Sequence, residues 1–131
     1  LEHNPKIVSF SSYAWNFNLS YSLANQIKKE FPDTVLIFGG PYFPVEKNEN
    51  EEFLKKNGAI DFFIEGEIAY LNLLERLFEK NMNINQVKSV PLPNVKTIYQ
   101  GEFINNQISK RIDDLDNVPS PYLNGLLDTF F

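Results

Sequence analysis

The chain has 131 residues, no cysteine and a net charge of −5, and 43% of its residues are apolar and 15% aromatic. This is the length of one domain with enough apolar residues for a core. The absence of cysteine excludes disulfides, iron–sulfur ligation and thiol catalysis within these residues. The acidic balance, with a pI near 4.8, argues against a nucleic-acid partner.

Nothing in the chain has the length or apolarity of a membrane span, and no signal peptide is recognisable. We therefore expect a cytoplasmic protein without a membrane partner. The single histidine, His3, lies near the start and argues against a histidine-based metal or proton-relay site.

Three short apolar runs are typical of buried strands, and each ends in a polar or glycine-bearing loop. These strands are expected over 6–11, 34–38 and 60–64, with helices over 18–31, 46–56 and 67–80. Strands that alternate with helices of this length predict βαβ units and a parallel sheet. The loops after such strands meet at one edge of the sheet, where open α/β sheets bind ligands.

The pattern changes after residue 81. Residues 95–99 and 102–104 flank Gln100 and Gly101, which predicts a β-hairpin with a short turn. The expected fold class is thus α/β, a partial Rossmann-like parallel sheet of three βα units followed by a hairpin and a linker. The expected regions are 5–81 for the α/β part, 82–110 for the hairpin extension and 111–131 for the linker.

The strand over 34–38 is apolar on both faces. Right-handed crossovers between parallel strands laid down in one direction place both connecting helices on the same face. The sequence therefore predicts that the connecting helices leave one face of the sheet uncovered. That face would be covered by the C-terminal region, by another copy of the chain or by part of a longer protein. A fragment, or a homo-oligomer through that face, is the expected consequence.

The loop after the first strand combines a hydroxyl, a phenol, an indole and an amide in Ser11, Tyr13, Trp15 and Asn16. Aromatic faces and hydrogen-bonding groups suit a flat, partly polar ligand. The alternative is structural, with Trp15 closing the top of the core and Asn16 or Asn18 capping the helix.

The second loop begins with Gly39, Gly40 and Pro41. Two glycines after a buried strand allow the main chain to approach a ligand closely or to adopt a positive φ. A tight turn explains them equally well. The spacing is not that of a dinucleotide fingerprint, which needs G-x-G-x-x-G leading directly into a helix.

The third loop holds Glu65, Gly66 and Glu67. Paired carboxylates can serve in acid–base chemistry, but Glu67 at a helix start is also explained by the helix dipole. The acid pair is the only support for a small hydrolase. With no Ser–His or Cys–His pair, metal-ligand cluster or P-loop, the residues indicate a binding module.

Four segments, taken together and in order, resemble a known family. Residues 9–16, 38–41, 60–67 and 115–122 resemble the motifs G-F-S-x-Y-x-W-N, GGP, iD-x-x-x-x-GEGE and lPSPY. These motifs occur in the cobalamin-binding domain of cobalamin-dependent radical S-adenosylmethionine (SAM) proteins. That domain is flavodoxin-like, and cobalamin lies over the C-terminal edge of its strands.

The resemblance implies a set of cobalamin-binding positions. They are Ser11, Tyr13, Trp15 and Asn16 around the corrin ring, Gly39, Gly40 and Pro41 approaching by main chain, and Gly66 and Glu67 closing the third side. It also implies that the chain begins at the family's third strand and lacks the D-x-H-x-x-G ligand motif of some cobalamin domains.

The implied function is the cobalamin-binding fragment of a radical SAM enzyme such as a methyltransferase or cyclase. The linker would lead to an absent radical SAM domain, which would hold the 4Fe–4S cluster and SAM. The chain alone is expected to be inactive. The alternative is a ligand-free α/β scaffold for protein–protein interaction.

Overall fold

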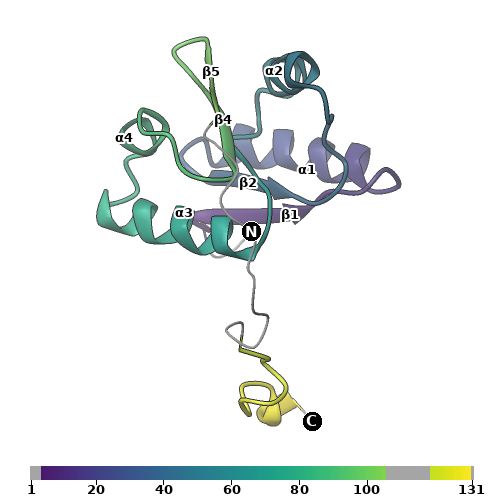
Figure 1. Cartoon of the computed structure of the whole chain (residues 1–131), viewed down its shortest axis with the longest axis vertical. Coiled ribbons are helices and arrows are strands. Elements are labelled where there is room, and N and C mark those ends of the chain that lie inside the picture. Colours follow the sequence, from purple (N-terminus) through teal and green to yellow (C-terminus); the bar gives the residue numbers. More distant parts are fainter. Residues whose placement is uncertain (1–3, 106–118, 131) are drawn as a thin grey trace.

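The computed structural model of the chain describes residues 4–105 and 119–130. Its centre is a five-stranded mixed sheet with the strand order β1-β2-β3-β4-β5 (Figure 1). The strands are β1 (Ile7–Ser11), β2 (Val35–Gly39), β3 (Phe62–Ile64), β4 (Val95–Tyr99) and β5 (Glu102–Asn105). The first three are parallel, and β4 and β5 are antiparallel to their neighbours. The α/β class, the three parallel strands and the hairpin are therefore confirmed.

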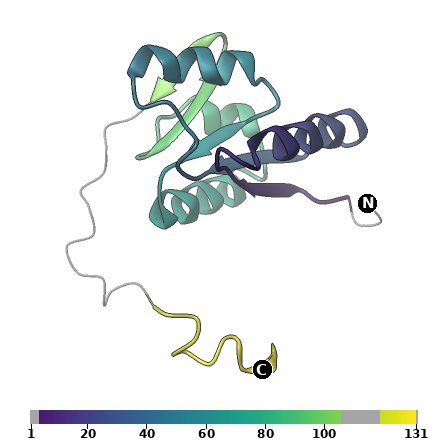
Figure 2. The ribbon, with the colours of Figure 1, turned by 90° about the vertical axis from the view of Figure 1, so that its right-hand side faces the viewer.

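Helices connect these strands and cover the sheet. They are α1 (Phe17–Glu30), α2 (Lys47–Lys56), α3 (Glu67–Glu79) and α4 (Ile84–Lys88), with a short 3₁₀ turn η2 (Asp128–Phe130) near the end. The sequence pattern missed α4, although Asn83 accepts a hydrogen bond from the Gln86 backbone N–H at its N-cap. Residues 119–130 lie apart from the sheet (Figure 1 and Figure 2).

Successive side chains of β2 point to opposite faces of the sheet, and a hydrophobic core lies on each face. Leu36 and Phe38 pack with α1 and α2 on one face, while Val35 and Ile37 pack with α3 and α4 on the other. All four side chains are at most 1% exposed. Burial on both faces explains why β2 is a continuous apolar run, as the sequence predicts.

The predicted uncovered face is wrong. The helices α3 and α4 bury Leu73, Leu77 and Val87 against the face opposite to α1 and α2. The crossover rule did place α1 and α2 together, but it applies only between parallel strands. Because β4 is antiparallel to β3, the connection between them was free to cross to the other face. Helices of the chain itself therefore cover both faces of β2.

Two helices direct apolar residues to solvent. The sequence predicts an apolar stripe on α1 that includes Leu19, Leu23, Ala24 and Ile27. Ala24 and Ile27 are buried together with Phe17, whereas Leu19 and Leu23 are 76% and 51% exposed. The sequence predicts that the inward residues of α3 include Ile68, Leu71, Leu77 and Phe78. Leu77 is buried with Ala69 and Leu73, and the other three are exposed. When apolar residues occur on two sides of a helix, the sequence pattern does not show which side faces the core.

A buried ion-pair cluster joins β2 and β3 where these strands begin. The Asp61 carboxylate accepts a hydrogen bond from the Leu36 backbone N–H at 2.8 Å. It also pairs with the Lys28 ammonium at 2.7 Å and with the Lys88 ammonium at 3.2 Å. The Asp61 side chain is only 9% exposed, so these three donors replace the water that burial removes.

Within the described ranges, no helix is both long and apolar enough to cross a membrane. Residues 111–118 of the linker expected over 111–131 lie outside the described residues, as does His3. The expected division into regions at 81 and 110 stays a prediction, although β3 and β4 belong to one sheet.

Candidate functional site

The loops after the three parallel strands meet at one edge of the sheet, as the sequence predicts. Main-chain hydrogen bonds join the first loop to the second: the Ser12 N–H donates to the Gly39 carbonyl at 2.6 Å, and the Tyr42 N–H donates to the Ser12 carbonyl at 3.1 Å. The third loop is joined to the start of β4 by the Glu65 N–H, which donates to the Asn94 carbonyl at 2.9 Å. Main-chain hydrogen bonds thus fix the first two loops to each other and the third loop to the start of β4.

Gly40 is required for this connection. Its φ is +123°, a conformation that L side chains rarely adopt, and a Cβ there would lie 2.5 Å from the Ser12 carbonyl oxygen. The tight-turn interpretation of Gly40 is thus correct in part, because the close approach it permits is to the protein's own main chain. Packing against Ser12 also leaves the Ser12 hydroxyl buried, without a hydrogen-bond partner among the described residues.

A shallow groove of about 430 Å³ crosses this edge between β1 and α3. Five of the nine predicted site residues line it, namely Ser11, Gly39, Gly40, Gly66 and Glu67. Its far wall includes Ser9 and Tyr70, whose hydroxyls are 2.9 Å apart. The sequence predictions did not include either residue, because Ser9 occupies the glycine position of the first motif and Tyr70 lies inside α3.

Tyr13 and Trp15 form an aromatic pair in the loop that follows the groove residue Ser11, with Tyr13 half-buried and Trp15 exposed. Their ring centroids are 4.7 Å apart and their planes differ by 16°, which is a stacked arrangement. Trp15 is 81% exposed, so the interpretation of Trp15 as a plug in the core is wrong. An exposed indole held by a second ring offers a flat apolar face to a ligand.

Asn16 keeps the first loop in shape. Its Oδ1 accepts from the Tyr13 backbone N–H at 2.8 Å, and its Nδ2 donates to the Ser11 carbonyl at 3.0 Å. It occupies the N-cap position of α1 but makes no side-chain cap hydrogen bond, so the capping interpretation is wrong. Asn16 thus acts by fixing the Tyr13–Trp15 pair.

Gly66 shapes the third loop. Its φ is +90°, and a Cβ there would meet no atom within 4 Å, so the backbone conformation alone favours glycine. Glu67 begins α3 and is exposed. A carboxylate in the first turn is favourable to the helix dipole, which accounts for Glu67 without any catalytic role.

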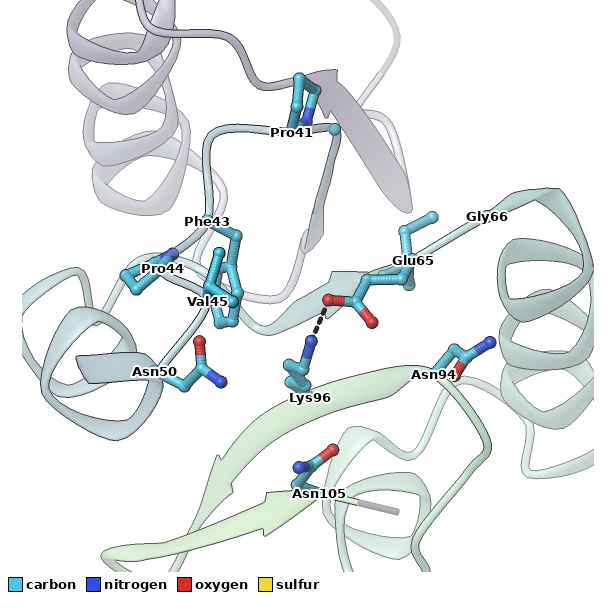
Figure 3. A pocket seen from close by; sticks show the side chains of 12 residues that line it. Pro41, Phe43, Pro44, Val45, Asn50, Glu65, Gly66, Asn94, Lys96 and Asn105 are labelled. Carbon is cyan, nitrogen blue, oxygen red and sulfur yellow. Dashed lines mark hydrogen bonds and ion pairs between the residues drawn. The ribbon is translucent and has the colours of Figure 1, made fainter. Parts of the chain in front are cut away.

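A second cavity, of about 650 Å³, lies on the other side of the second loop (Figure 3). Gly40, Pro41 and Gly66 line it together with residues from α2, β3, β4 and β5. Lys96 of β4 projects into it, although this lysine is only 7% exposed. The Lys96 ammonium pairs with the Glu65 carboxylate and lies 4.7 Å from the centroid of the Phe43 ring.

The sequence predictions missed Lys96. The sequence pattern of a hairpin does not indicate that this lysine is buried. The pairing of β4 with β3 brings it beside the loops that contain Gly40 and Gly66. Glu65 is the partner of this lysine, which gives one member of the predicted acid pair a structural role. No group of three or more His, Cys, Asp or Glu residues that could hold a metal ion occurs in the part of the chain that the structure describes.

Comparison with known proteins supports the family resemblance. No family model matches the chain. The chain is 29% identical over 126 residues to the cobalamin-dependent radical SAM methyltransferase TokK of Streptomyces tokunonensis, a match that covers 95% of this chain and 17% of TokK. It is 26% identical over 127 residues to the 2-(S-pantetheinyl)-carbapenam-3-carboxylate methyltransferase of Streptantibioticus cattleyicolor, covering 95% of this chain and 18% of that protein.

Two conclusions follow from these matches. The predicted resemblance to cobalamin-dependent radical SAM proteins is confirmed over nearly the whole chain. The chain spans less than a fifth of the length of the curated relatives it matches. The similarity therefore concerns one region of those methyltransferases.

Proposed function

We propose that the chain is a cobalamin-binding region of a radical SAM enzyme, such as a methyltransferase. The similarity to TokK over 95% of the chain is the observation that carries the proposal. The chain has no cysteine, so the iron–sulfur cluster of such an enzyme would be held by another part of a longer polypeptide. SAM would bind there as well.

The edge of the sheet fits a large, flat ligand. Tyr13 and Trp15 would contact the corrin ring through their exposed faces, with Asn16 holding them and Ser11 offering a hydroxyl. Gly39, Gly40 and Pro41 would approach by main chain, and Gly66 and Glu67 would close the third side. When bound, cobalamin supplies the alkyl-transfer chemistry, and the role of these residues is to bind and orient it.

Absorbance titration with hydroxocobalamin tests the proposal. We expect saturable spectral changes with the chain or with a longer polypeptide that contains it, and at least a tenfold weaker affinity in Trp15→Ala. Phe78→Ala is the matched control, because Phe78 is also exposed but lies near the far end of α3. Absence of binding by the longer polypeptide, or equal affinities for both variants and the wild type, would refute the proposal.

A further inference from the structure

The 650 Å³ cavity is separate from the groove in which most of the predicted residues lie. One wall is the loop that contains Gly40, Phe43 and Val45, and the opposite wall comes from β3, β4 and β5. The two hollows share only Gly40, Ile64 and Gly66, which form the ridge between them. A ligand lying on the ridge could therefore extend a side arm into the cavity.

The Asn50 side chain indicates that the described residues of the cavity lack a hydrogen-bond donor for its oxygen. It lies in α2, is only 6% exposed and lines the cavity (Figure 3). Its Oδ1 is buried and has no hydrogen-bond partner among the described residues. Buried polar atoms are nearly always paired, so an unpaired acceptor at a cavity wall calls for a donor other than the described residues, such as a bound ligand.

The charges in the cavity indicate that this donor is neutral. The Lys96 ammonium is the buried cation of the cavity, and its charge is balanced by the Glu65 carboxylate. An anion would have to displace Glu65, and a cation would face Lys96 directly. The group that fits has no net charge, donates to Asn50 and can accept from neighbouring amides, and a carboxamide meets all three conditions.

We propose that this cavity is a subsite for an uncharged carboxamide arm of the corrin ring, with Asn50 as its acceptor. The inference rests on the proposed function, and a corrin ring carries several such arms around its rim. Val45 lines the same cavity as Asn50 and is 93% exposed. The loop can therefore yield to an incoming arm without breaking apolar packing by that side chain.

The test compares Asn50→Leu with Asn48→Leu in the chain or in a longer polypeptide that contains it. Both substitutions replace asparagine by leucine in α2, but Asn48 is exposed. Each variant is titrated with cobalamin and with cobinamide, which keeps the ring carboxamides but lacks the nucleotide tail. We expect Asn50→Leu to weaken both ligands about tenfold, which corresponds to about 1.4 kcal/mol. Asn48→Leu should leave both affinities unchanged.

Urea unfolding of the same variants provides the second readout. Asn50→Leu removes an unpaired buried acceptor, so it should unfold at the same or a higher urea concentration than the wild type. If leucine overfills the site, Asn50→Ala takes its place. Unchanged affinity for both ligands overturns the inference, and so does a loss for cobalamin alone, because the arm would then come from the nucleotide tail. If the wild type binds neither ligand, the proposed function itself fails.

Discussion

Gly40 provides the sharpest stability test of the strand-edge geometry. In Gly40→Ala the new methyl group would lie 2.5 Å from the Ser12 carbonyl oxygen at a residue whose φ is +123°. Two separate costs arise, one from the backbone conformation and one from the collision. Gly66→Ala isolates the first, because Gly66 has a φ of +90° but open space around its Cβ position.

The magnitudes follow from these two geometries. Holding a residue other than glycine in such a backbone region costs about 1–3 kcal/mol, which is the whole loss expected for Gly66→Ala. Relieving the collision with Ser12 adds about 1–3 kcal/mol, by analogy with overpacked cores. Gly40→Ala should therefore lose about 2–6 kcal/mol, a large part of the stability of an ordinary domain.

Equilibrium urea unfolding, followed by circular dichroism, measures the series. Gly58→Ala is the control, because no positive φ and no neighbour within 4 Å oppose a methyl group there. It should be neutral or stabilising by up to about 1 kcal/mol. The reasoning is refuted if Gly40→Ala is no less stable than Gly66→Ala, or if either matches Gly58→Ala.

Three further predictions concern the ion pairs and the aromatic pair. Asp61→Asn removes the charge that two lysines share, so calorimetry should show a loss of about 3–5 kcal/mol, and a loss below 1 would contradict the buried-pair account. Glu65→Ala should destabilise the chain more than Lys96→Met in urea unfolding, since the Lys96 side chain is 8% exposed and the Glu65 side chain 47%. The reverse order would contradict the burial of Lys96. Trp15→Ala should change thermal stability by less than about 1.5 kcal/mol, the contribution of an aromatic pair; a larger loss would mean that Trp15 supports the core.

The sequence predicted the parts of the fold that depend on local pattern. The run over 34–38 is buried on both faces, and Gln100 and Gly101 both have positive φ in the hairpin turn. The glycines at 39, 40 and 66 were also recognisable, since each lies at or just after the end of a predicted strand. These signals come from neighbouring residues and need no knowledge of the tertiary structure.

The rest depended on which elements meet in space. Because β4 returns antiparallel beside β3, α3 and α4 cover the face that was predicted to be open. The same pairing buries Lys96 and forms the second cavity. Nothing in the local pattern of a hairpin indicates that one of its lysines will lie between two glycine loops.

Trp15 allows the most direct test of the central claim, because it is the only tryptophan in the chain and lies at the proposed cobalamin site. Its fluorescence reports on ligand binding at that position without any label. The account predicts saturable quenching as cobalamin is added to the chain, with a weaker affinity in Tyr13→Ala. Unchanged Trp15 fluorescence at saturating cobalamin, after correction for absorption by the ligand, would contradict the account.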